Sequence, residues 1–180
     1  ALVEMVKDLP QIQSVWIWDE KGVPIAGNRR YPVPRSLNVS DREYFQWLRA
    51  GKGDVFITEP LISRATGEKF FDFSYVRRTV DGSFAGVISI SLFPEYFTRF
   101  YSDLASDEPG LTVTLARPDG AVVTRWPEPP PGATHIAPDS PWARAMREGR
   151  AEGALELTSS LDGERRLVAY RRLANYPLYA

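Results

Sequence analysis

The alternation of apolar and polar residues along the chain predicts a protein built mainly from short strands. Residues 15–27 (VWIWDEKGVPIAG) form two β-rich arms around a turn at Gly22, which is typical of a β-hairpin. Further strands are expected over 54–62, 69–79 and 84–92, where β-branched and aromatic residues are frequent. Antiparallel pairing between consecutive strands is therefore the expected local structure.

Helical signals are fewer. Ser40 is a good N-cap residue, and Glu43 follows it at the spacing of a capping box, so a helix is predicted over 41–50 and is expected to end at Gly51. A second helix is predicted over 94–105, where aromatic and aliphatic residues recur at helical spacing.

The same order of elements then starts again. A hairpin is predicted over 111–126, a capped helix over 140–149 and two strands over 153–160 and 165–173. Glycines at turns and helix ends recur in the second half of the chain at a nearly constant distance in sequence. The pairs are Gly22/Gly120, Gly51/Gly149 and Gly67/Gly163, where Gly67 belongs to the turn Ala65-Thr66-Gly67. This periodicity indicates two copies of one module.

We therefore predict an α+β fold of two tandem PAS-like modules, each an antiparallel sheet with flanking helices. The first module is placed at residues 1–93, a connecting helix at 94–108 and the second module at 109–180, truncated at its last strand. Ala1 to Pro10 is interpreted as the end of a longer helix. A ligand pocket is expected on the inner face of a curved sheet, under its helix and long loop.

Composition narrows the functional classes. The formal net charge is −1, from 22 Lys+Arg and 23 Asp+Glu, so no nucleic-acid partner is expected. The chain has no cysteine and a single histidine, His135, and therefore neither a metal site nor a cofactor is expected. No run of about 18 apolar residues suggests a membrane span.

No pattern of residues indicates catalysis. His135 lies in the Pro- and Gly-rich segment PPPGATHIAP, which favours a solvated loop histidine over a member of a catalytic triad. The acidic pairs at Asp19-Glu20 and Asp107-Glu108 fall at turns, and phosphate-binding motifs rich in glycine are missing. Binding is the better interpretation.

The helix predicted over 41–50 supplies the first candidate binding residues. Arg42 offers a planar guanidinium that suits a carboxylate or phosphate, and Tyr44 and Phe45 are expected to line a pocket. Packing in the core remains an alternative for Phe45. Trp47 is assigned to the core.

The strand over 69–79 supplies the opposite wall. Alternation separates one set of residues, Phe71, Phe73, Tyr75 and Arg77, from another, Phe70, Asp72, Ser74 and Val76. We assign the first set to the pocket, because aromatic rings that end in a guanidinium suit a small anion with an apolar part. The alternative is that Phe71 and Phe73 are core residues and Arg77 lies on the surface.

Three segments in order carry a family resemblance: SDREYF, GDVFITEPLISRATGEKFFDFS and VRRTVDGSFAGVISISL. Together they resemble the double Cache (tandem PAS-like, or PDC) sensor domains of bacterial histidine kinases, diguanylate cyclases and chemoreceptors. The resemblance covers essentially the whole chain. It implies a ligand in the first, membrane-distal module.

When the roles of the family's residues are carried over by position, the resemblance implies that Arg42 and Tyr44 contact the polar end of a ligand. It implies that Phe73, Tyr75 and Arg77 lie on the opposite wall of the pocket. Amino-acid-binding members carry an aspartate on the last strand of the module, where this sequence has Ser91. A carboxylate or another small polar solute is therefore expected in place of an α-amino acid.

The resemblance also implies location and partners. We expect a non-enzymatic sensor on the periplasmic face of the inner membrane, in a membrane-anchored receptor that can form a homodimer and whose output is a kinase, a cyclase or a chemotaxis signal. The alternatives are a solute-binding or adhesion module without signalling output, and a hydrolase that depends on His135.

Overall fold

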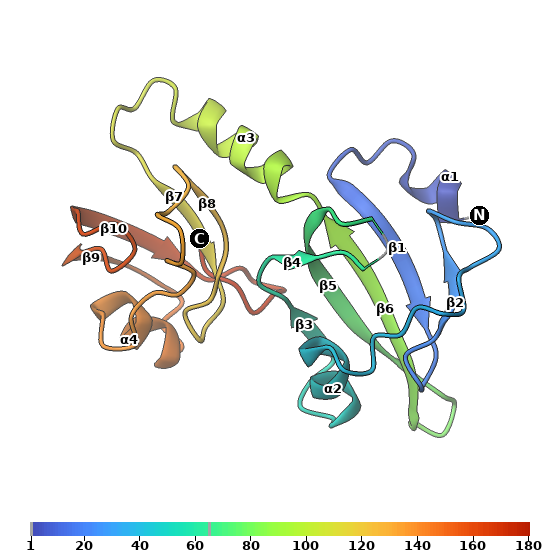
Figure 1. Ribbon diagram of the computed structural model, residues 1–180. Coiled ribbons are helices and arrows are strands. Elements are labelled where there is room, and N and C mark those ends of the chain that lie inside the picture. The colour runs from blue at the N-terminus through green and yellow to red at the C-terminus, as the bar shows by residue number, and fades with distance from the viewer. Residues whose placement is uncertain (1, 65) are drawn as a thin grey trace. The chain divides into compact units, whose positions relative to one another are not determined.

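The computed structural model describes residues 2–64 and 66–180, so the predictions for Ala1 and Ala65 lie outside the described residues. The chain divides into two compact units, Ala1–Tyr96 and Phe97–Ala180 (Figure 1). The division falls inside helix α3 (Pro94–Leu104), in the segment that was predicted to connect the modules.

The first unit is an antiparallel sheet with a short helix on one face. Its strands follow the order β2-β1-β6-β5-β3, and β4 pairs with β5. Helix α1 (Leu2–Val6) lies at its start, and helix α2 (Glu43–Arg49) packs on β3, β5 and β6. The strand bounds are β1 Ile12–Trp18, β2 Pro24–Gly27, β3 Val55–Ile57, β4 Leu61–Ile62, β5 Lys69–Arg78 and β6 Phe84–Leu92.

The second unit repeats this order with two separate strand pairs. Its elements are β7 (Val113–Ala116), β8 (Val122–Trp126), α4 (Pro141–Arg147), β9 (Glu152–Thr158) and β10 (Arg165–Arg171). Tyr179 exchanges backbone hydrogen bonds of 2.8 and 2.9 Å with Ala116 and also bridges to Arg172. The residues around Tyr179 thus take the place that β6 has between β1 and β5. The predicted α+β class, with antiparallel sheets and few helices, is confirmed.

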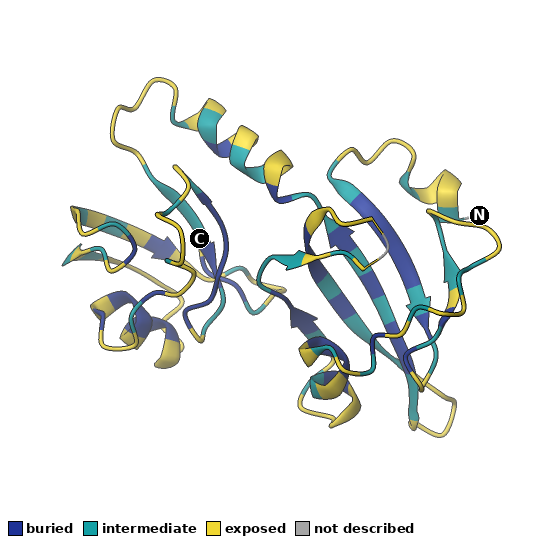
Figure 2. Ribbon diagram, viewed as in Figure 1, coloured by how far each residue is buried: buried dark blue, intermediate teal, exposed yellow. Residues whose placement is uncertain are grey.

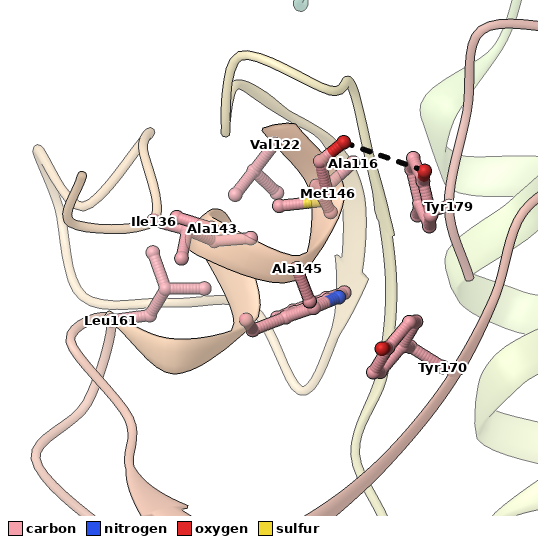
Figure 3. Close-up of a cluster of buried hydrophobic side chains, with 10 residues drawn as sticks. Ala116, Val122, Ile136, Ala143, Ala145, Met146, Leu161, Tyr170 and Tyr179 are labelled. Atoms are coloured by element: carbon pink, nitrogen blue, oxygen red, sulfur yellow. Dashed lines mark hydrogen bonds between the residues drawn. The ribbon is translucent and has the colours of Figure 1, made fainter. Parts of the chain in front are cut away.

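Each unit has its own apolar core (Figure 2). In the first unit, Phe45 and Leu48 of α2 are 0% and 1% exposed and pack toward Val87 and the rings of Trp16 and Trp18. In the second, Met146 of α4 and Tyr179 belong to one cluster, which Figure 3 shows with Tyr170 beside Tyr179. Burial of these side chains is the main source of stability for each unit.

The capping box predicted for α2 is wrong. The helix begins at Glu43, Arg42 is the N-cap residue, and no side chain caps it. The carboxylate of Asp41 instead pairs with Arg64 across 2.6 Å. The matching helix α4 does carry the predicted cap, because the Ser140 hydroxyl accepts a hydrogen bond from the Ala143 amide at 3.1 Å.

The glycines that revealed the repeat have backbone conformations that explain their positions. Gly51 and Gly149 follow α2 and α4 with φ of 68° and 71°, the left-handed conformation that ends many helices. The strand predicted over 54–62 is divided at Pro60 into β3 and β4. Proline supplies no amide to a strand ladder, which explains the break.

Candidate ligand-binding site

A small cavity of about 50 Å³ lies in the first unit between α2, the loop before it and the sheet. Tyr44 of α2 and Arg42, the N-cap residue of this helix, lie on one side, and side chains of β1, β5 and β6 form the floor. The lining residues are Ser14, Trp16, Trp18, Leu37, Asn38, Val39, Arg42, Tyr44, Ser63, Arg64, Phe70, Asp72, Ser89 and Ser91.

The floor of this cavity is polar because small residues occupy matching positions on adjacent strands. Ser14 of β1 lies opposite Ser91 of β6, and Ser91 lies opposite Asp72 of β5, so the three form one row across the sheet. In the next row, Ser89 lies opposite both Trp16 and Ser74. Serines in place of branched residues leave the space that larger side chains would fill.

Hydrogen bonds run along the first row toward the carboxyl group of Asp72. The indole N–H of Trp16 donates to the Ser14 hydroxyl at 3.1 Å, and that hydroxyl donates to Ser91 at 3.1 Å. The Ser91 hydroxyl in turn donates to the Asp72 carboxyl group. The row thus orients one side of a buried acid.

Asp72 is only 2% exposed, and its Oδ1 has no hydrogen-bond partner among residues 2–64 and 66–180. Burial raises the pKa of this carboxyl group to about 6, against the opposing effects of the Ser91 hydrogen bond and the positive charge of Arg42. The carboxyl group of Asp72 therefore changes its protonation state near pH 6.

Two guanidinium groups line the cavity, but their surroundings differ. Arg64 forms two hydrogen bonds with the Asp41 carboxylate, at 2.8 and 2.6 Å, so its charge is paired. Arg42 is half-buried and donates to the Ile62 carbonyl at 3.2 Å, and it forms no salt bridge within the described part of the chain. Arg42 is therefore the cation that remains available to a ligand.

Tyr44 is 3% exposed, and its hydroxyl is hydrogen-bonded to Ser89. Burial raises the pKa of this phenol well above its usual value, with a further contribution from the negative charge of Asp72. Tyr44 therefore remains neutral at all relevant pH values and acts as a hydrogen-bonding group.

A wider hollow of about 260 Å³ adjoins the small cavity and shares Arg42, Tyr44 and Arg64 with it. Thr58, Glu59 and Leu61 contribute to its other walls. The shared residues thus lie at the boundary between an inner space that suits a polar head group and an outer space that suits the rest of a small molecule.

The structure brings together three of the residues singled out from the sequence. Arg42, Tyr44 and Ser91 all line the small cavity. Phe45, for which packing was the alternative, is fully buried in the core, and its ring meets that of Phe84 edge-on at 5.4 Å. Trp47 contacts Phe56 at 5.3 Å between ring centroids, consistent with packing.

The other three predicted residues lie elsewhere. On β5 the residues that face α2 and the cavity are Phe70 and Asp72, so alternation directs Phe73, Tyr75 and Arg77 to the opposite face of the sheet. Arg77 donates hydrogen bonds at 3.1 Å to the carbonyls of Trp18 and Ala85. The structure therefore places none of these three at the cavity, and the same holds for Phe71, which was grouped with them and is fully buried.

Sequence reasoning missed Asp72, although a signal was present. Asp72 is the only acidic residue of β5, and it stands among aromatic residues in KFFDFSYV. An ionisable residue in the middle of an apolar strand is costly to bury, and such residues often belong to functional sites. The alternate positions of β5 carry Phe71, Phe73 and Tyr75, so by pattern alone they are the more typical lining of an apolar pocket.

The second unit contains a larger cavity, of about 530 Å³, which extends between β7 and β10. Tyr179 bridges to Ala116 of β7 and to Arg172, the residue after β10. In the first unit, β6 fills the equivalent position between β1 and β5. His135 is exposed in the same unit, and its Nδ1 lies 3.0 Å from the hydroxyl of the adjacent Thr134.

Comparison with known proteins agrees with this architecture. The family model of the double Cache-like histidine kinase sensor domain matches residues 94–180. The extracellular domain of the candidate histidine kinase rpHK1S-Z16 is 31% identical, with a TM-score of 0.80 over 99% of this chain and 72% of that one. The chain belongs to the double Cache sensor family. No curated protein sequence matches this Cache domain.

Two chemoreceptor domains share the fold of this Cache domain at lower identity. The ligand-binding domain of PctC from Pseudomonas aeruginosa PAO1, solved with GABA, is 18% identical, with a TM-score of 0.54 over 94% of this chain and 71% of that one. The ligand-binding domain of CtaA from Pseudomonas fluorescens, solved with L-isoleucine, is 16% identical, with a TM-score of 0.60 over 98% of this chain and 69% of that one. Across residues 2–64 and 66–180, no helix is long and apolar enough to cross a membrane.

Proposed function

We propose that the first unit is the ligand-sensing module of a bacterial membrane receptor, that it lies in the periplasm, and that it binds a small polar molecule with a carboxylate group. The observation that carries this proposal is the half-buried guanidinium of Arg42, which lines the cavity and forms no salt bridge with a carboxylate of residues 2–64 or 66–180. An arginine in such a position is well suited to bind a carboxylate through two parallel hydrogen bonds.

The second unit supports assignment of the ligand site to the first unit, because it carries different residues at the matching positions. Counted from Gly51 and Gly149, Ser140 and Trp142 occupy the positions of Arg42 and Tyr44. The N-cap position of this helix is therefore charged in the first unit and neutral in the second. The related PctC and CtaA domains bind GABA and L-isoleucine, both of which carry a carboxylate.

Signalling follows from ordering of the cavity wall. A ligand that contacts Arg42 and Tyr44 favours the conformation in which α2 and its preceding loop are closed over the sheet, and it shifts the population toward that state. The output of the full receptor is a histidine kinase in this proposal, with a cyclase or chemotaxis module as variants. A solute-binding or adhesion module without output would contain the same cavity, and a parent protein without membrane segments would favour it.

The test is a thermal-shift screen followed by calorimetry with mono- and dicarboxylates of two to six carbons and with amino acids. We expect Arg42→Ala to weaken binding of the best carboxylate at least about 30-fold, because loss of one partner from a buried charge pair costs about 2 kcal/mol or more. The control is Arg49→Ala, which removes an exposed arginine from the same helix. Equal affinity in the Arg42→Ala and control proteins would contradict the proposed site.

A further inference from the structure

The cavity of the second unit occupies the same place in the repeat as the small cavity of the first. The lining positions match when they are counted from the glycine pairs of the repeat. The matched pairs are Ser14/Thr112, Trp16/Thr114, Arg42/Ser140, Tyr44/Trp142, Ser63/Ser159 and Phe70/Arg166, whose members line the first and the second cavity respectively. The first cavity exists although β6 completes its sheet, so the side of the second cavity that faces α4 is more than a gap between β7 and β10.

Two arginines give the second cavity an excess of positive charge. Arg125 of β8 and Arg166 of β10 both line it, and both pair with the carboxylate of Asp162. Partial burial alone would raise the pKa of Asp162, but hydrogen bonds, first among them that from Arg166, hold this pKa well below its usual value. Asp162 is therefore ionised, and two guanidinium groups against one carboxylate leave one positive charge in excess. A third lining arginine, Arg165, is already paired with Glu156 at 2.6 Å.

Unused polar atoms surround this charge. The indole N–H of Trp142, the Nε–H of Arg166 and the hydroxyl of Thr112 are buried without a hydrogen-bond partner in the described part of the chain. Trp142 is only 7% exposed, and a buried donor without an acceptor destabilises the folded state. All three groups can donate, and the position that matches Asp72 of the first cavity is the apolar Val168. The second cavity thus suits an anion and offers no acid for an amine.

The rest of the wall is apolar and the space is larger. The volume is about 530 Å³, against about 50 Å³ for the small cavity of the first unit, and it lies in the range of pockets that enclose whole organic ligands. Aliphatic side chains make up much of the lining: Leu111, Val113, Leu157, Leu161 and Leu167. An anion that fills this space therefore carries an apolar chain.

We infer that the second unit contains a second ligand site, which binds an aliphatic monocarboxylate. The carboxylate accepts hydrogen bonds from Arg166 and Trp142, and the hydrocarbon chain lies against the aliphatic wall. One carboxylate neutralises the one positive charge in excess. This inference goes beyond the proposed function, which assigns a site to the first unit alone, and the two sites differ in the element that supplies the cation: the start of α2 in the first unit, and β8 and β10 in the second.

The test follows the indole N–H signals of the 180-residue protein by ¹H–¹⁵N NMR during titration with heptanoate, which is longer than the acids of the first screen. Trp142→Phe and Trp18→Phe each remove one signal and thereby assign a reporter to the second and to the first cavity. We expect the Trp142 signal to move downfield and saturate, because its N–H gains an acceptor. Heptanamide, the uncharged probe of the same length, should bind about ten-fold or more weakly, because hydrogen bonds to charged groups are the stronger ones.

A pair of variants on β10 tests the cation. Arg166→Gln should weaken heptanoate binding about ten-fold or more, because it removes the charge and the free Nε–H. The control is Arg171→Gln, which removes an exposed arginine from the same strand and should leave the affinity within about three-fold of wild type. Equal affinity in the two variants would refute the role of Arg166.

The two reporters separate this inference from the proposed function. If heptanoate leaves the Trp142 signal in place, or heptanamide moves it at the same concentrations, the second site is refuted, and this comparison needs no variant to fold. Movement of the Trp18 signal alone would refute the second site while the carboxylate site at Arg42 stands. Saturable movement of the Trp142 signal alone would support the second site, whatever the first screen finds.

Discussion

At the residue scale, Asp72 connects stability to pH. Burial raises its pKa from 3.8 to about 6, so the folded protein retains a proton between these values that the unfolded chain releases. The free energy of unfolding therefore decreases through this acid as the pH rises from about 4 to about 6. The loss is on the order of 3 kcal/mol at neutral pH, since one pKa unit corresponds to about 1.4 kcal/mol.

This decrease in stability with rising pH leads to a specific prediction for Asp72→Asn. The amide cannot ionise, so the variant should be more stable than the wild type at pH 7.5, by about 1–3 kcal/mol, and close to it at pH 4. Urea unfolding of both proteins at a series of pH values measures the difference, in which contributions from other carboxylates cancel. Asp103→Asn serves as the control. A difference that is independent of pH would show that Asp72 titrates normally.

At the scale of elements, the junction of β1, β5 and β6 depends on Gly86. Its φ is 117°, and a Cβ atom at this position would lie 2.0 Å from the carbonyl oxygen of Trp18. The guanidinium of Arg77 donates to that same carbonyl and to Ala85, so the strand cannot move away without loss of these hydrogen bonds. The β5–β6 pairing and the floor of the cavity therefore need glycine here.

We expect Gly86→Ala to be strongly destabilising. Gly82→Ala is the matched control, because Gly82 has a φ of 86° but no atom within 4 Å of its Cβ position. The control measures only the backbone strain of an alanine at positive φ, which costs about 1–2 kcal/mol. Gly86→Ala should lower the free energy of unfolding by roughly 2 kcal/mol more, because of the clash with the Trp18 carbonyl. Urea midpoints of the two variants test this, and equal midpoints would mean that the strands adjust freely.

The same elements show what the sequence could predict. Turn glycines and alternation located the strands and the repeat, because those signals are local. The face of β5 that meets α2 is a tertiary choice, and both faces carry aromatic residues, such as Phe70 and Phe73. Alternation alone could not decide between them, so Arg42 and Tyr44 were placed at the cavity but Asp72 was not. The start of α2 was also wrong, because Asp41 pairs with Arg64, which is distant in sequence.

At the scale of the whole molecule, the two units differ in the residues that they carry at matching positions. Each has a separate apolar core, and the arginine and acid of the candidate site lie in the first unit. The position of Asp72, counted from Gly67 and Gly163, is Val168 in the second unit. One repeat thus retains charged groups that reduce its stability, while its copy has an apolar residue at the matching position.

This division predicts that the units respond separately in calorimetry. The best carboxylate from the thermal-shift screen, at one hundred times its dissociation constant, should stabilise the first unit by about 2.7 kcal/mol and move one unfolding transition upward. Met146→Ala, in the core of the second unit, should lower the other transition, because such truncations cost about 2–5 kcal/mol, and it should leave the dissociation constant unchanged. If ligand and substitution instead shift one common transition, the units unfold cooperatively, and binding in the first unit depends on the integrity of the second.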